Sequence, residues 1–304
     1  MRKVFILSFL FFQLSSTIGF GQSNYEGIAA SVQLDSFMIT AEKQGFKVEE
    51  FIEIVQKDSS FRQAFENIRL FEHQISSKMV FYKGERKEKA TFYQQMRQKM
   101  INNCRYNLID EKRASGDFYK KDGSYRYLTA EMYDRVFFTK DTICPSQAAE
   151  VPAKGMQKYY NELKQFIFQP GEQVDVPLVS KKTALFETHL QKYYEYTITQ
   201  DQYKGVKNAY AFTITIKPEY AGKKTNKTLI KYLKTYFEPE SFQVLGRVYD
   251  IVYKGLASCD VHMEVDLTQI EGIYLLQNIS YEGTWNIPGK KRETGTFTAR
   301  LDFN

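Results

Sequence analysis

Near the start of the chain, apolar residues recur at the spacing of helices that bury one side. Two sets follow the i, i+3, i+4, i+7 pattern: Val48, Phe51, Ile52 and Val55, and then Phe61, Ala64, Phe65 and Ile68. They predict two short amphipathic helices, the second capped by Asp58 or Ser59. Residues 32–41, which come before them, read as a strand. A stripe this narrow packs one side of a helix onto a flat surface.

From 71 to 140 the apolar period changes to two, which is typical of strands. Residues 71–83 alternate, and one face of the next stretch carries Ala90, Phe92, Met96 and Met100. Residues 117–128 predict a hairpin of two aromatic strands that turns at Asp122-Gly123, because glycine accepts the positive φ of a tight turn. The loop 141–155, rich in Pro, Ala and Ser, is either a domain boundary or a long crossover.

The second half of the chain predicts two helices followed by a long series of strands. Residues 156–168 have the strongest helical pattern, and a second helix over 183–193 turns its apolar side, with His189, inward. Seven strands follow in sequence: 193–199, 209–217, 228–237, 243–253, 259–269, 273–285 and 293–303. This order predicts the α+β class, with a curved antiparallel β-sheet, a half-barrel-like meander, packed on a few amphipathic helices.

The first 21 residues have the order of a signal peptide. Arg2 and Lys3 precede an unbroken apolar run, residues 4–12. Small and polar residues follow, up to Gly21, where a signal peptidase could cut the chain. The apolar run is too short for a permanent membrane helix, which needs about 20 residues. No later segment is apolar enough to cross a membrane. We expect residues 1–21 to be removed and the rest to be exported, soluble, in the periplasm or at the outer surface.

The length that remains allows one large domain or two modest ones. We divide it into 22–150, a helix pair with β-hairpins, and 151–304, helices with a seven-stranded antiparallel meander. The two parts can equally form one continuous domain. The 22 Tyr and 24 Phe residues favour antiparallel sheet. The net charge of +6 is mild, and basic and acidic residues are interleaved, so we expect no nucleic acid partner.

Three cysteines in an oxidising compartment leave one thiol unpaired. Cys259 shares one face of a predicted strand with Val261, Met263, Val265 and Leu267. A cysteine on such a face behaves as a small buried apolar residue. Cys104 and Cys144 both lie in polar, turn-like surroundings. We therefore expect a Cys104–Cys144 disulfide, with Cys259 free.

Familiar catalytic and nucleotide-binding motifs are absent from the sequence: GxGxxG, GxxxxGK[ST], HExxH, CxxC and GxSxG. We expect no cofactor and no enzyme activity. One local cluster carries candidate chemistry, because alternate residues of a strand point the same way: Asp260, His262 and Glu264. They are candidate metal ligands or an acid/base site. The simpler interpretation is that these three residues lie on the solvent-exposed face of a half-buried strand.

Two stretches, KVEEFIEIVQKDSSFRQAFENIR (47–69) and GDFYKKDGSYRYLTAEMYDRVFFTK (116–140), resemble a group of uncharacterised exported bacterial envelope proteins. That resemblance implies no activity and no functional residues. Separately, the order of helices and then meander over 156–303 is similar to the curved half-barrel of outer-membrane lipoprotein carriers. In that family one antiparallel sheet wraps around helices and holds acyl chains in an apolar cavity. The likeness rests on the order of elements and on no motif.

The leading hypothesis is an exported envelope binding or carrier protein that shelters an apolar, lipid-like ligand. Its candidate ligand-binding residues are Tyr159, Leu163 and Phe166 of a lid helix, and Phe212, Tyr236 and Tyr281 of the strands. A second hypothesis is a ligand-free scaffold or interaction module with envelope proteins as partners. A third is a metal-dependent hydrolase that uses His262 and its neighbours. The first hypothesis predicts an apolar cavity with room for a ligand, and the second predicts a filled core without one.

Overall fold

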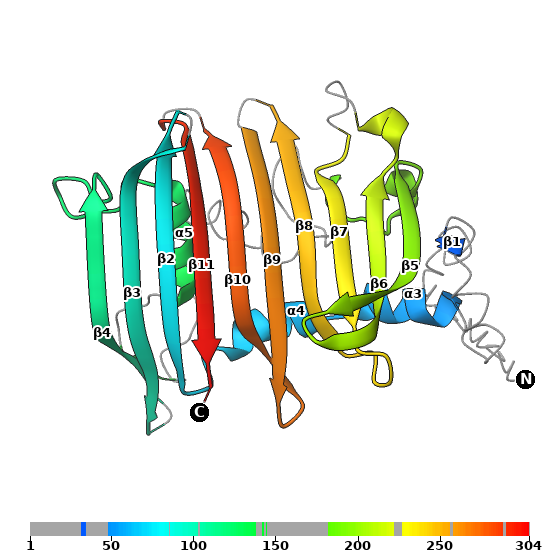
Figure 1. The fold of residues 1–304 in the computed structure, drawn as a ribbon, viewed down its shortest axis with the longest axis horizontal. Coiled ribbons are helices and arrows are strands. Elements are labelled where there is room, and N and C mark those ends of the chain that lie inside the picture. Colours follow the sequence, from blue (N-terminus) through cyan, green and yellow to red (C-terminus); the bar gives the residue numbers. More distant parts are fainter. Residues whose placement is uncertain are drawn as a thin grey trace, which may run out of the picture.

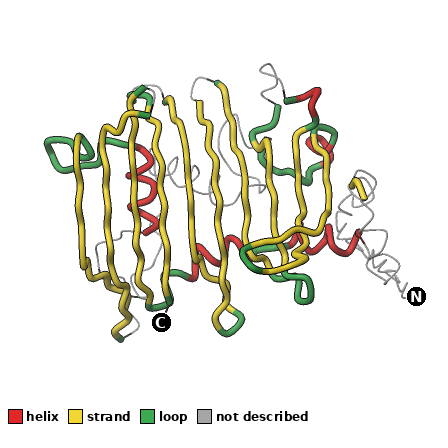
Figure 2. The backbone as a smooth tube through the Cα atoms, viewed as in Figure 1, coloured by secondary structure: helices red, strands yellow, loops and turns green. Residues whose placement is uncertain are grey.

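Most of the described chain lies in one open sheet of eleven strands, with helices on one face (Figures 1 and 2). This computed structural model describes residues 32–34, 48–84, 86–102, 104–137, 142, 144, 182–221, 227–255, 258–287 and 290–303. The predicted signal peptide 1–21, almost all of the predicted loop 141–155 and the predicted helix 156–168 lie outside these residues. So does the part of the first predicted strand that follows Leu34.

The sheet has the strand order β1-β5-β6-β7-β8-β9-β10-β11-β2-β3-β4. The strands are β1 (Val32–Leu34), β2 (His73–Lys83), β3 (Lys87–Ile101), β4 (Cys104–Gly116), β5 (Tyr194–Tyr203), β6 (Val206–Ile216), β7 (Ile230–Phe237), β8 (Val244–Lys254), β9 (Ser258–Ile270), β10 (Ile273–Asn286) and β11 (Glu293–Asp302). All neighbours pair antiparallel except β1, which runs parallel to β5.

Strands β5 to β11 neighbour one another in chain order, which confirms the predicted antiparallel meander. One of the connections, between β9 and β10, is a tight turn. Glu271 and Gly272, between β9 and β10, both have positive φ, the backbone of a two-residue hairpin turn. Strands β2, β3 and β4 continue the sheet beyond β11, so strands from the stretches 22–150 and 151–304 share one sheet.

The described helices are α3 (Val48–Lys57), α4 (Ser60–Asn67), α5 (Leu128–Phe137) and α7 (Thr188–Gln191), with a 3₁₀ turn η3 (Pro218–Tyr220). Helices α3 and α4 form where the spacing predicts them. Ser59 is the N-cap position of α4, but the side chain that caps the helix is that of Asp58, whose Oδ1 accepts from the Ser60 N–H at 3.1 Å.

Three local predictions are wrong. The predicted two-strand hairpin 117–128 is a single bridge between Tyr119 and Tyr125, although its turn has Gly123 at φ +79° as expected. The next residues form helix α5 and not a strand. The helix predicted over 183–193 shrinks to α7, because Glu187 has the extended backbone (φ −70°, ψ 135°) that precedes a helix, and His189 is exposed rather than inward.

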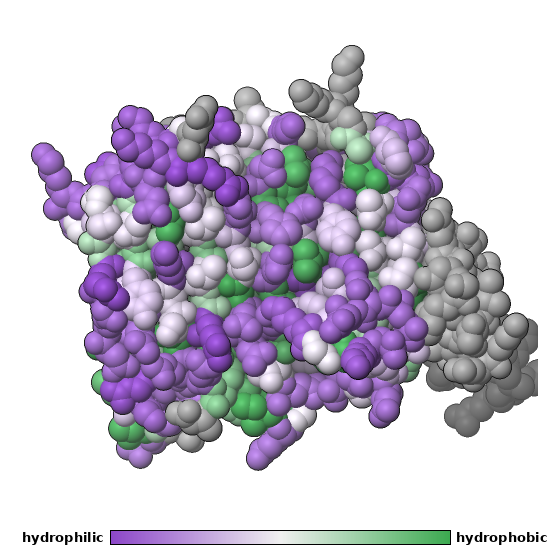
Figure 3. Space-filling view, viewed as in Figure 1, coloured by the Kyte–Doolittle hydropathy of each residue, from purple (hydrophilic) through white to green (hydrophobic). Residues whose placement is uncertain are grey.

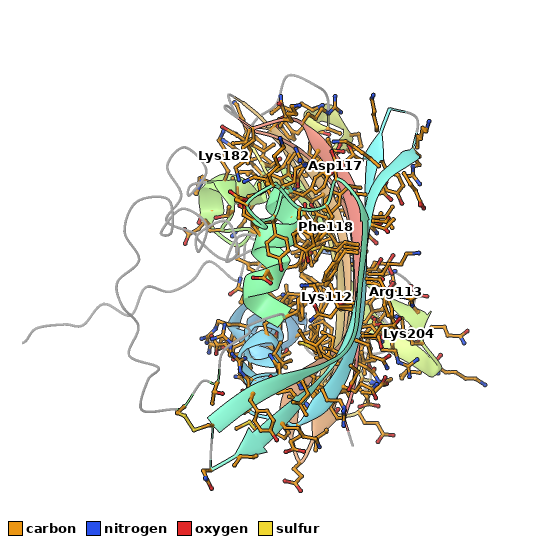
Figure 4. All side chains as sticks on the ribbon, turned by 90° about the vertical axis from the view of Figure 1, so that its left-hand side faces the viewer. Lys112, Arg113, Asp117, Phe118, Lys182 and Lys204 are labelled. Carbon is orange, nitrogen blue, oxygen red and sulfur yellow. A yellow bond between two sulfur atoms is a disulfide. The ribbon has the colours of Figure 1, made fainter. Side chains whose placement is uncertain are left out.

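The sheet curves around the helices, and its concave face carries the core (Figure 4). Strand β9 shows the division between the two faces. Cys259, Val261 and Met263 are buried, whereas Asp260 and His262, which alternate with them, are exposed. Figure 3 views the convex face, where polar side chains predominate and apolar ones form small separate spots. The apolar side chains of the sheet are therefore gathered in the core on its concave side.

A buried ion pair joins the helix pair to the sheet. The guanidinium of Arg247 donates to Asp58 Oδ2 at 3.2 Å and to Thr235 Oγ1 at 3.0 Å, and it lies 4.6 Å from the centre of the Phe61 ring. The side chains of Arg247 and Asp58 are 10% and 11% exposed, so solvent screens the pair only weakly.

Replacing Asp58 with alanine should lower the free energy of unfolding by about 2–3 kcal/mol, because a buried guanidinium loses an anionic acceptor and α4 loses its cap. Urea denaturation measures the change. Glu53→Ala is the control: it breaks an exposed pair with Lys57 and should cost about 0.5 kcal/mol or less. Equal effects of the two substitutions would contradict this account.

Candidate functional site: the concave face of the sheet

Helix α5 is fixed to the sheet by a carboxylate at the start of β11. Glu293 accepts from the backbone N–H of Leu128 at 2.7 Å, and from the backbone N–H and hydroxyl of Thr129 at 2.9 and 2.6 Å. The side chain therefore satisfies amide groups that have no partner within the helix. Burial raises the pKa of Glu293, and the hydrogen bonds from Thr129 and Leu128 oppose that rise without cancelling it.

This raised pKa predicts that stability depends on pH through Glu293. Between the ordinary pKa of 4.5 and the raised pKa of the folded state, the folded protein still holds the proton that the unfolded chain has lost. The stabilising contribution is full below that pH and is lost as the pH rises through the folded-state pKa. Urea unfolding from pH 4.5 to 7.5 should show wild-type stability falling relative to Glu293→Gln. A difference that stays constant over this range would contradict the prediction.

The body of α5 packs on β10 and β11 through aromatic rings. Tyr133 is fully buried, with its ring centre 3.9 Å from that of Phe297 and 5.4 Å from that of Tyr281. Its hydroxyl lies 3.9 Å from the sulfur of Met263 on β9. Phe137 adds a second contact with Phe297 at 5.5 Å. These contacts cover the concave face over β10 and β11.

Helices α3 and α4 cover the lower edge of the same face (Figure 1). Phe51 of α3 lies 6.0 Å from Phe212 on β6 and 5.1 Å from Phe237 on β7. In α4, Phe61 lies 6.2 Å from Tyr249 on β8. The upper parts of β6 to β9 carry further buried side chains on the concave side: Ile214, Ile230, Ile251 and Val261. Helix α7 lies on the concave side at the upper end of the sheet, beside β5 and β6 (Figures 1 and 4), and its Leu190 belongs to the same core.

The six predicted ligand-binding residues do not form one group. Tyr159, Leu163 and Phe166 lie outside the described residues. Phe212 and Tyr281 are both buried on the concave face, but under different helices and four strands apart, roughly 19 Å at the usual strand spacing.

Tyr236 lies on the opposite, convex face, where its ring stacks on Tyr203 at 4.1 Å. The cause is an irregularity in the pairing of β7 with β8, between Ile230 and Tyr232. One extra residue there shifts every later side chain of the strand to the other face. Simple alternation from Ile230 therefore assigns Tyr236 to the wrong side.

The predicted metal-binding residues Asp260, His262 and Glu264 lie on the convex face. His262 is held between Asp250 Oδ1, 2.6 Å from its Nδ1, and Glu264 Oε1, 3.3 Å from its Nε2. Partial burial lowers the pKa of His262, but the hydrogen bonds with these carboxylates outweigh it and the pKa is raised. Within the described residues, no group of three His, Cys, Asp or Glu side chains has the geometry to hold a metal ion. The metal assignment stays a prediction.

The Cys104–Cys144 disulfide is present, with a Cα–Cα distance of 4.2 Å, and Cys259 is free and buried. Burial raises the pKa of the Cys259 thiol to about 12, so the thiol stays protonated and unreactive. It lines a depression of ≈ 650 Å³ at the upper end of β8 to β11, together with charged side chains that include Lys254 and Arg292. No helix in the described part of the chain is long and apolar enough to cross a membrane.

Neither a family model nor a curated protein matches the chain. The solved structures that are similar to it include these two. A domain from Vibrio parahaemolyticus, provisionally described as an outer membrane lipoprotein-sorting protein domain, aligns at a TM-score of 0.26 and 7% identity over 80% of this chain and 92% of that one. A structure on lipid–protein interactions in lipovitellin aligns at a TM-score of 0.25 and 11% identity over 77% of this chain and 25% of that one. Scores this low establish no common fold, so function has to be inferred from this chain's own residues.

Proposed function

We propose that this chain is an exported envelope protein that binds an apolar, lipid-like ligand on the concave face of its sheet. The observation that supports the proposal is the extent of that face. Eleven strands span roughly 48 Å at the usual spacing. The helices α3, α4 and α5 are only about 12–15 Å long. Their aromatic rings contact the face at the lower edge, through Phe51 and Phe61, and on β10 and β11, through Tyr133.

The side chains in the centre of the face suit a flexible apolar guest. Met263 is fully buried there, and the hydroxyl groups of Tyr133 and Tyr249 lie 3.9 and 3.1 Å from its sulfur. Methionine adapts its shape to irregular apolar neighbours, and a thioether is a weak hydrogen-bond acceptor. Such a centre rearranges at low cost when an apolar molecule enters.

The predicted helix 156–168, with Tyr159, Leu163 and Phe166, is our candidate for a lid over this face. The disulfide between Cys104 and Cys144 supports the assignment to an oxidising compartment, which for an exported protein is the periplasm or the outer surface.

The second candidate function is a packed scaffold without a ligand. This function is favoured because α3 covers Phe212 and α5 covers Tyr281. Those parts of the concave face leave no space for a ligand. In the scaffold account the whole face is filled by the protein itself.

Energy transfer from tryptophan separates the two candidates. Trp285 is the one tryptophan of the chain, and it is buried on the concave side, with its indole N–H donating to the Tyr281 hydroxyl at 2.6 Å. We expect saturable transfer to the neutral apolar probe N-phenyl-1-naphthylamine, reversed by an excess of hexadecan-1-ol. Transfer that never saturates, or that the alcohol does not reverse, would favour the scaffold.

A pair of variants tests the location of the ligand. Ile251→Phe adds bulk to a buried position of the upper concave face and should weaken probe binding roughly 10-fold. Ile273→Phe adds the same bulk at a position that is 39% exposed at the lower end of β10 and should leave binding unchanged. Equal affinities of the two variants would place the probe elsewhere.

A further inference from the structure

The lower end of the concave face holds a polar corner. Three neighbouring strands place polar side chains in register: His73 on β2 opposite Gln98 on β3, and Gln98 opposite Asn107 on β4. The Gln98 side-chain amide donates to the carbonyls of Ile68 and Phe71, both at 2.7 Å, and His73 Nδ1 lies 3.0 Å from the Phe71 carbonyl. The corner is thus built against the chain that leaves α4.

Arg105 of β4 lies in this corner, opposite Met100, and is only 5% exposed. Its Nε is buried without a hydrogen-bond partner, and among the described residues no carboxylate forms an ion pair with it. Its charged neighbour is another cation, Arg69, which together with burial lowers the pKa of Arg105. Burial and the charge of Arg105 also hold the pKa of His73 below its ordinary value, so this imidazole is neutral near pH 7.

A comparison with Arg247 shows how unusual this is. Arg247 is buried on the same face of the sheet to a similar degree, 9% exposed, yet it donates to Asp58 and to Thr235. A buried cation without an anion is unfavourable. Within the described residues, Arg105 is a buried cation that no anion balances.

Apolar side chains stay exposed around the same corner. Ile109, one row along β4 from Asn107, is 51% exposed although it lies opposite the buried Met96 on the concave side. Leu70, which directly follows Arg69, is 65% exposed. A molecule with its charged end at Arg105 would find an apolar surface next to it.

We propose that this corner, Arg105 with Arg69, binds the anionic head of a single-chain amphiphile whose apolar chain runs past Ile109 along β3 and β4, at the other end of the concave face from Ile251. The inference rests on the proposed function and adds the charge of the ligand. A guanidinium donates two parallel hydrogen bonds to a carboxylate or to a phosphate monoester, and these two head groups are the ones that the corner fits. A neutral head group would leave Arg105 without an anion.

The test compares the binding of hexadecanoic acid with that of hexadecan-1-ol to delipidated protein, each measured directly by isothermal titration calorimetry. We expect Arg105→Gln to weaken the acid roughly 10- to 100-fold and to leave the alcohol unchanged, since only the charge-assisted hydrogen bonds are lost. Arg113→Gln is the matched control. Arg113 is on the same strand, but it lies on the convex side (Figure 4), pairs with Glu111 and has a side chain that is 71% exposed. It should change neither affinity.

The stability of the ligand-free protein gives a second readout that a merely structural arginine would not produce. Arg105→Gln should unfold at a urea concentration equal to or above that of the wild type, because it removes a buried charge without an anion. A variant that is markedly less stable and that weakens acid and alcohol alike would overturn the proposal.

The remaining outcomes separate this inference from the proposed function. If acid and alcohol bind equally and Arg105→Gln changes neither, the head-group site is wrong while the apolar ligand stands. If neither compound binds, both proposals fail for amphiphiles. Inorganic phosphate that then stabilises the wild type but not Arg105→Gln would show a site for the free anion instead.

Discussion

Replacing Tyr133 with alanine is expected to lower the free energy of unfolding by about 3–5 kcal/mol, the usual cost of deleting a fully buried aromatic side chain. The Tyr133 ring is the main contact between α5 and the sheet: it packs against the rings of Phe297 and Tyr281, and its hydroxyl lies near Met263. Without the ring, α5 keeps the Glu293 cap but loses its packing. Urea denaturation followed by circular dichroism measures the change.

Tyr133→Phe is the control for that experiment. It keeps the ring and removes only the hydroxyl, so it should cost about 0.5–1.5 kcal/mol. A loss below 1 kcal/mol in the alanine variant would contradict the packing described for α5. It would mean that the concave face over β10 and β11 tolerates an empty space of aromatic size.

Removing the Cys104–Cys144 disulfide should have the second large effect. The bridge spans 40 residues and closes a loop that contains β4 and α5, so in the chain-entropy model it contributes about 4 kcal/mol by restricting the unfolded chain. We expect the double variant Cys104→Ser, Cys144→Ser to lose that amount in urea unfolding. The wild type should show the same loss in dithiothreitol.

Cys259→Ala is the matched control for the disulfide. It alters a buried free thiol, so whatever its cost, that cost should be the same with and without reductant. Peptide mapping of the non-reduced protein checks the pairing directly. A bridge that includes Cys259, or a double variant as stable as the wild type, would contradict the structure.

The alternation along β9 and the turn at Glu271-Gly272 are both local signals, and this is why the meander could be predicted from the sequence. Helix α5 could not be predicted in the same way. Leu128, Ala130 and Met132 alternate like a strand, while Leu128, Met132 and Tyr133 fit one side of a helix. The group that decides in favour of the helix is Glu293, which caps it from 165 residues away.

The concave positions of Phe212 and Tyr281 follow from regular alternation, whereas Tyr236 was misplaced because pairing irregularities in β7 are invisible in a sequence. Arg105 was missed for a related reason. Its burial depends on the register of β4 against β3 and on the position of α4. That no described anion lies next to it can be seen only in the folded structure. The sequence shows only an arginine next to a cysteine.

Native mass spectrometry of the protein, purified from its native cells without detergent, tests the central claim most directly. We predict a mass above that of the polypeptide, and that solvent extraction releases an apolar molecule, which by the further inference carries a carboxylate or a phosphate. A mass equal to the bare polypeptide in every preparation would contradict a ligand-binding role and would favour the packed scaffold.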